Sequence, residues 1–120
     1  MNKIENFRDL EVWKRAHQLV LVVYRMTKDF PSDERFGLVS QMRRAAVSVP
    51  ANIAEGFKRQ SKAEKIRFYN ISEASLEELK YFFILSKDLA YISDNALIME
   101  DAETISKMLY RLIEAINKSR

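Results

Sequence analysis

The sequence predicts an all-α protein, an antiparallel up-down-up-down four-helix bundle, formed as a single domain over residues 1–120. Apolar residues recur at three- and four-residue steps along most of the chain, which is the spacing of one helical face. Only two glycines and two prolines occur, whereas a sandwich or barrel would need many more turn residues. The segments between the periodic stretches are short, so successive helices are expected to be antiparallel.

The first helix is expected from about Asp9 to Asp29. Asp9 is a suitable residue to cap its start, because a side-chain carboxylate can accept from a free amide of the first turn. Pro31 ends it, since the residue before a proline avoids the α region. Its apolar face comprises Leu10, Trp13, Ala16, His17, Val20, Val23, Tyr24 and Thr27.

The second helix is expected from about Asp33 to Glu55, with Gly56 just past its end. Pro50 lies inside it, where proline removes a backbone hydrogen bond. The apolar spacing continues in phase across Pro50, so we expect one helix kinked at Pro50 and not two helices. Asn52 falls on the apolar face, where its amide must be hydrogen-bonded. We expect the kink to curve the helix around the core; a ligand-binding notch is the alternative.

Two capping signals predict the remaining helices. Ser61 and Glu64 have the spacing of a capping box and begin a third helix, which we extend to about Tyr91. The residues at 93–95, Ser-Asp-Asn, begin a fourth helix that continues to about Asn117.

Two stretches are apolar all round the helix, from Leu19 to Tyr24 and from Tyr81 to Leu85. A helix of a small bundle buries a single stripe, so the outer side of these stretches requires another subunit. We therefore predict a homo-oligomer; scattered surface apolar groups on a monomer are the alternative. The interface candidates are Leu19, Leu21, Val22, Tyr81, Phe83 and Ile84.

The sequence lacks the residue patterns of common catalytic and metal sites. There is no cysteine, and the one histidine, His17, cannot supply the paired Glu-x-x-His motifs of di-metal bundles. No glycine-rich phosphate loop occurs. We predict no metal, no cofactor and no enzymatic activity. The N-terminus has no apolar signal segment and no apolar run reaches membrane-spanning length, so a cytoplasmic protein is expected.

Basic charge is concentrated between Ser40 and Asn70, where seven bases and two acids occur among several aromatic residues. Basic residues interleaved with aromatics predict contacts to a phosphate backbone and to unpaired bases; a solvated charged surface is the alternative. We expect Lys58, Arg59, Lys62 and Lys65 to gather at the end where the second and third helices join. At least one of Arg43 and Arg44 is expected in a salt bridge within or between subunits. The nucleic-acid-binding candidates are Arg43, Arg44, Lys58, Arg59, Lys62, Lys65 and Arg67.

Three strings, FRDLEVWKRAHQLV, GLVSQMRRAAVSVPANIAEG and ASLEEL, resemble the small bacterial proteins encoded in intervening sequences of 23S ribosomal RNA genes, which are sometimes classed as ribosomal-protein-like. The resemblance runs from Phe7 to about Ile116. It implies an antiparallel four-helix bundle that assembles as a ring-like homopentamer. A more distant relative by fold is the accessory protein of diversity-generating retroelements, a basic pentamer that works with a reverse transcriptase and nucleic acid. This chain has Ala74-Ser75 where Gly-Ser is expected in many members.

These observations favour a non-enzymatic oligomeric protein that binds structured RNA through a basic patch. An oligomeric scaffold that binds a protein partner and no nucleic acid is the alternative. An enzyme of unknown kind is a third hypothesis, for which the sequence offers no residues.

Overall fold

The computed structural model describes residues 3–119 and contains four α-helices preceded or joined by two short 3₁₀ helices. The helices are α1 (Glu11–Thr27), α2 (Leu38–Lys58), α3 (Lys62–Asp88) and α4 (Ala96–Lys118), with η1 (Phe7–Asp9) before α1 and η2 (Ser32–Glu34) before α2. Residues 3–119 contain no β-strand, which confirms the all-α class. No helix in this range is both long enough and apolar enough to cross a membrane.

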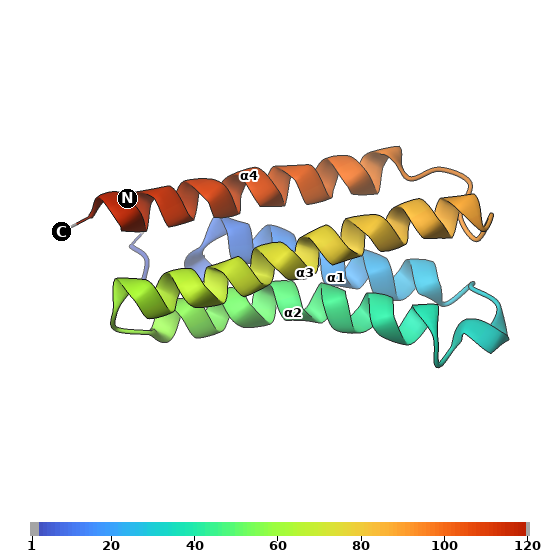
Figure 1. Cartoon of the computed structure of the whole chain (residues 1–120), viewed down its shortest axis with the longest axis horizontal. Coiled ribbons are helices and arrows are strands. Elements are labelled where there is room, and N and C mark those ends of the chain that lie inside the picture. The colour runs from blue at the N-terminus through green and yellow to red at the C-terminus, as the bar shows by residue number, and fades with distance from the viewer. Residues whose placement is uncertain (1–2, 120) are drawn as a thin grey trace.

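The four helices lie side by side along the long axis of a molecule of 49 × 26 × 20 Å (Figure 1). The backbone of each helix approaches two others, in the cyclic order α1, α2, α3, α4; within the described residues no Cα atoms of the pairs α1–α3 and α2–α4 come within 8 Å of each other. This is the arrangement of a four-helix bundle, with α1 and α3 on one diagonal. The α2–α3 connection lies at one end, and the α1–α2 and α3–α4 connections lie at the other (Figure 1).

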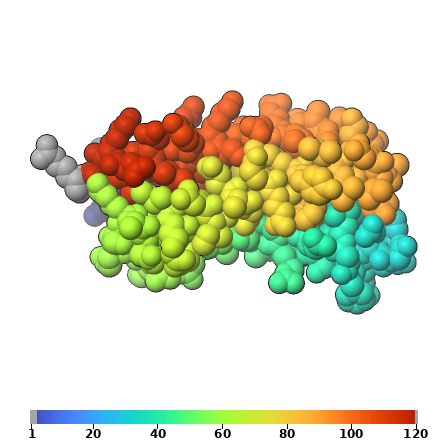
Figure 2. All heavy atoms as spheres, viewed as in Figure 1, coloured from blue at the N-terminus to red at the C-terminus, as the bar shows by residue number. Residues whose placement is uncertain are grey.

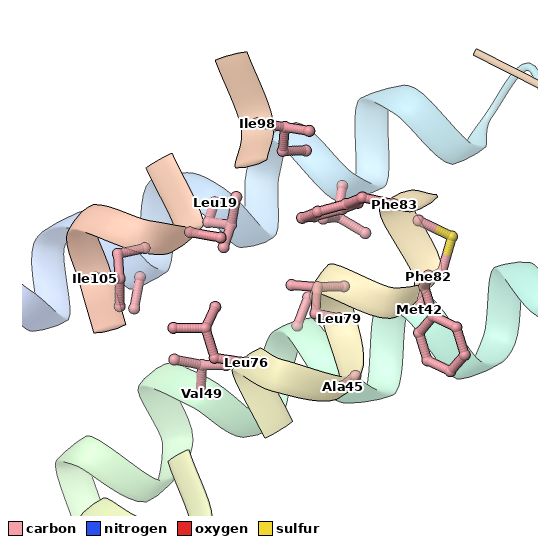
Figure 3. Close-up of a cluster of buried hydrophobic side chains, with 14 of the residues drawn as sticks. Leu19, Met42, Ala45, Val49, Leu76, Leu79, Phe82, Phe83, Ile98 and Ile105 are labelled. Carbon is pink, nitrogen blue, oxygen red and sulfur yellow. The ribbon is translucent and has the colours of Figure 1, made fainter. Parts of the chain in front are cut away.

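The core is built from one buried stripe per helix. Figure 3 shows Leu19 of α1, Met42 of α2, Leu76 of α3 and Ile105 of α4 pointing into the space between the helices. Phe83 of α3 lies in the same cluster and is one of the largest fully buried side chains. Full burial of such a side chain contributes about 1.5–3 kcal/mol relative to exposure. The apolar residues at this 3.6-residue spacing therefore identify the helices, and their burial drives the packing of the helices.

The start of α1 differs from the prediction. Asp9 belongs to η1, where its carboxylate accepts from the amides of Glu5 at 2.8 Å and Asn6 at 3.1 Å. These bonds lower the pKa of Asp9 below its ordinary value. Asp9 therefore closes a capping box with Asn6 and does not cap α1, which begins at Glu11 with no side-chain cap.

The bounds of α2 are also shifted toward the C-terminus. It begins at Leu38 and not at Asp33, because the preceding residues form η2 and a turn; the Glu34 carboxylate accepts from the Leu38 amide at 3.2 Å. Gly56 lies inside the helix and not beyond its end. The helix is continuous through Pro50, as predicted, while a bend there stays a prediction.

Both capping signals for α3 and α4 have counterparts in the structure. The Ser61 hydroxyl accepts from the Glu64 amide at 3.1 Å, although the Glu64 carboxylate binds Arg67 and does not return to close the box. At α4, the Asp94 carboxylate accepts from the Ala96 amide at 3.0 Å.

The third helix ends at Asp88, three residues before the predicted Tyr91. Ala90 takes a left-handed conformation with φ of 63°, and the Tyr91 amide donates to the Ser86 carbonyl at 2.9 Å. This is the geometry that terminates many helices, usually with glycine at the left-handed position. Because Ala90 stands where glycine is usual, the sequence carries no glycine to indicate that α3 ends here.

Small and polar residues form the seam between α2 and α3, the most extensive helix pair of the bundle. The Ser48 and Ser75 hydroxyls are 2.8 Å apart, and the buried Ser72 hydroxyl donates to the Val49 carbonyl at 2.8 Å. Asn52 is half-buried, and its amide donates to the Ser48 carbonyl at 2.8 Å and hydroxyl at 3.0 Å. The predicted hydrogen bonding of Asn52 is present, and through Ser48 it is linked to α3.

Candidate nucleic-acid interface

The structure brings the predicted cations of the α2–α3 connection together at one end of the bundle (Figure 1). We call this cluster the basic tip and define it as Lys58, Arg59, Lys62, Lys65 and Arg67. Lys58 ends α2 and Lys62 begins α3, so three residues join the two helices. The N-terminus of α3 adds the positive end of its macrodipole to the field of these side chains.

Lys65 has a structural contact within the basic tip. Its Nζ donates to the Phe57 carbonyl at 2.8 Å and to the Gly56 carbonyl at 3.4 Å, and it lies 5.5 Å from the centre of the Phe57 ring. The last carbonyls of a helix lack intrahelical partners and carry partial negative charge, which a cation stabilises. Lys65 therefore caps α2, and its charge is partly used by the fold.

The two arginines of the basic tip are held in exposed ion pairs. Arg59 is 3.0 Å from the Glu55 carboxylate and Arg67 is 3.1 Å from the Glu64 carboxylate. Exposed pairs of this kind contribute about 0–1 kcal/mol, so an incoming phosphate can replace the carboxylate at little cost. Both guanidinium carbons lie 4.6 Å from the centre of the half-buried Phe68 ring. Since the arginines cover Phe68, the basic tip offers phosphate contacts and no free stacking surface.

Lys58 and Lys62 are the uncommitted charges of the basic tip. Lys58 is exposed and Lys62 is half-buried, and neither has an ion pair or side-chain hydrogen bond within residues 3–119. They are therefore the tip cations best placed to contact an anion without first breaking another interaction.

Arg43 and Arg44 lie away from the basic tip, as predicted from the helical rise. Arg43 binds the end of α1: its Nε donates to the Thr27 hydroxyl at 2.9 Å and a terminal nitrogen donates to the Tyr24 carbonyl at 3.3 Å. Its guanidinium also lies 4.5 Å from the centre of the Tyr24 ring. Neither arginine has an ion pair within the described part of the chain, so the predicted intramolecular salt bridge is wrong. A salt bridge between subunits stays a prediction.

A groove of about 730 Å³ contains both arginines, along the outer side of α2 next to the α1–α2 connection. We call it the arginine groove. No carboxylate lines it, and Phe36 at its edge is 89% exposed. Its lining residues are Tyr24, Arg35, Phe36, Val39, Ser40, Arg43, Arg44, Val47, Ser48, Ala51 and Asn52. Sequence analysis missed Arg35 and Phe36, because it placed them in the first turns of α2; the signal was the adjacent Arg-Phe pair before Gly37.

The oligomer-interface candidates separate into two groups. Leu19 and Phe83 are buried in the core of the single chain, so they are unavailable to another subunit and their assignment is corrected. Leu21, Tyr81 and Ile84 are exposed. Val22 is half-buried and lines a cleft between α1 and α4. The exposed residues of α1 and α3 lie on helices that are not neighbours in the bundle, and they form separate surfaces.

Pro50 lines a shallow apolar groove between η1, α1 and α2. His17, on the same groove, stacks on Trp13 with ring centres 5.1 Å apart and an interplanar angle of 6°. Residues 3–119 contain no group of three histidine, cysteine or acidic side chains positioned to hold a metal ion. The ligand-binding notch at Pro50 stays a hypothesis, because the groove is lined mainly by apolar side chains.

Comparisons with known proteins place these features in a family. The family model described as 23S rRNA-intervening sequence protein matches residues 8–111. The chain is similar to a crystal structure at 1.70 Å of a protein with unknown function from the S23 ribosomal protein family of Bacteroides thetaiotaomicron. The two share 25% sequence identity with a TM-score of 0.79, over 86% of this chain and 95% of that chain. No curated protein matches the chain.

Proposed function

The chain belongs to the 23S rRNA-intervening sequence protein family, and on that basis we propose that it is a cytoplasmic, oligomeric, non-enzymatic protein that binds structured RNA through the basic tip. One observation carries this proposal: five cations converge on a short helix connection, and only two carboxylates pair with them. The family's description names 23S rRNA, which supports RNA as the nucleic acid.

The chemistry of the basic tip fits the RNA backbone better than the bases. Lys58 and Lys62 can each neutralise a phosphate, and Arg59 and Arg67 can exchange a carboxylate for one. Phe68 is covered by the two arginines and is not available to a base. The basic tip therefore favours recognition of backbone shape and charge without sequence specificity.

The positions of the exposed apolar residues support a ring-shaped oligomer. Such an oligomer would carry one basic tip on every subunit. A closed ring needs two different patches on each subunit, one for each neighbour. Leu21 on α1 and the pair Tyr81 and Ile84 on α3 are such patches, because the two helices lie on a diagonal of the bundle. In a ring every basic tip lies at the same level, which raises the local density of positive charge.

The alternative, a scaffold for a protein partner, is favoured by a different observation. Phe36, in the α1–α2 connection, and Leu97, in the first turn of α4, are large apolar residues that are 89% and 77% exposed. Exposed apolar surface of this kind often marks protein contacts. The experiment below decides between the two functions.

A tip variant with Lys58, Arg59 and Lys62 changed to Gln tests the proposal by titration of an RNA hairpin at several salt concentrations. We expect weaker binding and a log–log salt slope reduced by about 0.7–0.9 per lost contact. The matched control changes Arg15, Lys87 and Lys107 to Gln; they are exposed cations outside the tip, and the net charge changes equally. Lys65→Gln is tested separately because Lys65 caps α2. If the tip variant binds RNA with unchanged affinity and salt slope, the basic tip is only a solvated charged surface. That result would favour the alternative function, a scaffold for a protein partner.

A further inference from the structure

We propose that the arginine groove binds a single-stranded RNA segment, with one unpaired base stacked on Phe36 and backbone phosphates on Arg35 and Arg44. This inference rests on the proposed function, since it assumes that RNA is the ligand. It concerns a different surface at the other end of the bundle, where the α1–α2 connection lies (Figure 1).

The first support is the charge of the groove. Three arginines line it and no carboxylate does, whereas each arginine of the basic tip is paired with a glutamate. Arg44 is exposed and has no ion pair or side-chain hydrogen bond within residues 3–119. Arg35 contacts the Phe36 ring, with its guanidinium 5.4 Å from the ring centre. Guanidinium groups bind phosphate oxygens in pairs of parallel hydrogen bonds, so this groove suits a phosphate backbone.

The nearest carboxylate in the sequence forms no ion pair with the arginines of the groove within residues 3–119. Glu34 precedes Arg35, but its two oxygens accept from the Leu38 amide at 3.2 Å and from the Tyr91 hydroxyl at 2.8 Å. The Glu34 carboxylate therefore caps α2 and fixes the α3–α4 connection, and it is not among the groups that line the groove.

The second support is the exposed aromatic ring. Phe36 is 89% exposed at the edge of the groove, and Figure 2 shows the cyan and teal part of the chain, which contains the α1–α2 connection, protruding from one end of the molecule. A phenylalanine ring in water presents a face on which any base can stack. Arg35 also lies over the Phe36 ring, but Phe36 is still 89% exposed, so part of its ring is open to a base. Phe68 at the basic tip differs, because two arginines cover it and it is half-buried. A base can reach Phe36 only when it is unpaired, which selects single strands over duplexes.

The third support is a polar floor along the groove: Ser40 of α2 lies between Phe36 and Arg44 along the chain, and Asn52 lies about two turns beyond Arg44. Ser40 and Asn52 line the groove; the Asn52 amide nitrogen is used by Ser48, while its side-chain oxygen and the Ser40 hydroxyl have no partner in the part of the chain described. These two groups can bond a ribose hydroxyl or a base edge. Charge, stacking surface and polar floor together match an unpaired nucleotide with its flanking phosphates.

The test compares the full chain with Phe36→Ala in titrations of a twelve-nucleotide oligouridine and of a hairpin with the same number of phosphates. We expect Phe36→Ala to weaken oligouridine binding about ten-fold or more, as for loss of one base–aromatic stack, with hairpin affinity and both salt slopes unchanged. Arg44→Gln should reduce the oligouridine salt slope by about 0.7. Tyr110→Ala removes an exposed aromatic residue of α4 and Arg15→Gln removes a cation on the α1–α4 side; both should leave oligouridine binding unchanged.

Two results would overturn the inference. One is equal oligouridine affinity for Phe36→Ala and the unmodified chain, and the other is a fall in oligomeric mass for Phe36→Ala, which would make the groove a contact between copies. Loss of hairpin binding in the tip variant with no effect of Phe36→Ala would reject the groove alone. Loss of oligouridine binding in Phe36→Ala with an unaffected tip variant would reject the basic tip alone. Binding of neither RNA by the unmodified chain would reject both.

Discussion

At the scale of single residues, Lys80 is the most tightly held charge in the bundle. Its Nζ lies 2.7 Å from the Glu77 carboxylate of α3 and 2.6 Å from the Glu103 carboxylate of α4, and its side chain is only 11% exposed. Burial lowers the pKa of Lys80, but the hydrogen bonds to Glu103 and Glu77 outweigh it and raise the pKa above its usual value. The hydrogen bond to Lys80 in turn lowers the pKa of Glu103. The network therefore joins α3 to α4 through charge.

Glu103→Gln should destabilise the protein in a pH-dependent way. Because the pKa of Glu103 is lower in the folded state, its stabilising contribution is present above the pKa of the unfolded chain and is lost as pH falls through the folded-state pKa. We expect the variant to melt below the unmodified chain near neutral pH, with the difference closing in acid. Thermal unfolding across that range measures it. Glu100→Gln, on the same helix with no ion pair within residues 3–119, should show no such trend.

Single-residue roles were the part that sequence reasoning predicted least completely. The basic tip was predicted because its bases are close in sequence and a short connection must bring them together. At least one of Arg43 and Arg44 was expected in a salt bridge within or between subunits; within the single chain, Arg43 instead binds the end of α1. Lys80 of α3 likewise pairs with Glu103, which lies on another helix, α4. Such pairings depend on the relative placement of helices, which periodicity alone does not determine.

At the scale of elements, the seam between α2 and α3 depends on the absence of a side chain at Gly56. A Cβ atom at this position would lie 2.6 Å from Cε1 and 2.9 Å from Cδ1 of the buried Tyr69 ring, and 3.2 Å from Cβ of Phe68. Real contacts of a Cβ atom are longer, so the Tyr69 ring or the two helices would have to shift. Close packing of α2 on α3 therefore requires glycine here.

Gly56→Ala should lower the free energy of unfolding, although alanine is the better helix former by about 1 kcal/mol. Overpacking against the Tyr69 ring costs about 1–3 kcal/mol, so we expect a net loss of roughly 1 kcal/mol. Urea unfolding at one fixed protein concentration measures it, because association contributes to apparent stability. Gly37→Ala is the comparison, since its nearest neighbour is the flexible Glu34 carboxylate at 3.1 Å. A more stable Gly56→Ala would show that the seam can relax.

Helix number, order and class were predicted correctly, while four of the boundaries were not: the start of α1, both ends of α2 and the end of α3. The apolar stripes are long and regular, so they identify the four helices. The starts of α1 and α2 were placed too early because Asp9 and Asp33 resemble caps, although both lie in short 3₁₀ helices. Gly56 resembled a terminator, but it serves helix packing within α2. Residues with two possible roles, capping or packing, are ambiguous until the neighbouring helix is placed.

At the scale of the whole molecule, the bundle has two apolar surfaces that its own core does not use. The exposed residues of α3, Tyr81 and Ile84, lie apart from Leu21 of α1, because α1 and α3 occupy a diagonal. Sequence analysis predicted this excess of apolar surface from the two stretches that are apolar all round the helix. It also included Leu19 and Phe83, because periodicity cannot tell which side of an all-apolar helix faces the core.

Light scattering should return a multiple of the 14.1 kDa chain mass, with five subunits expected from the family resemblance. Changing Tyr81 and Ile84 to Glu should reduce that mass, because a charge at a buried subunit contact is strongly unfavourable. Leu97→Glu, at an even more exposed apolar residue on α4, is the control that should keep the mass. A stable monomer of the unmodified chain at micromolar concentration would contradict the prediction.

The unequal contacts around the bundle also set an order of local unfolding. The α2–α3 pair is the closest and most extensive, whereas α1 and α4 make the least extensive contact and leave a cleft floored by Leu19 and Ile105. Native proteins open in cooperative units, beginning where the fewest contacts must break. We therefore expect α4 to detach in transient openings while the α2–α3 hairpin stays folded. Such fluctuations would briefly expose core surface along α1 while leaving the basic tip, which sits on that hairpin, intact.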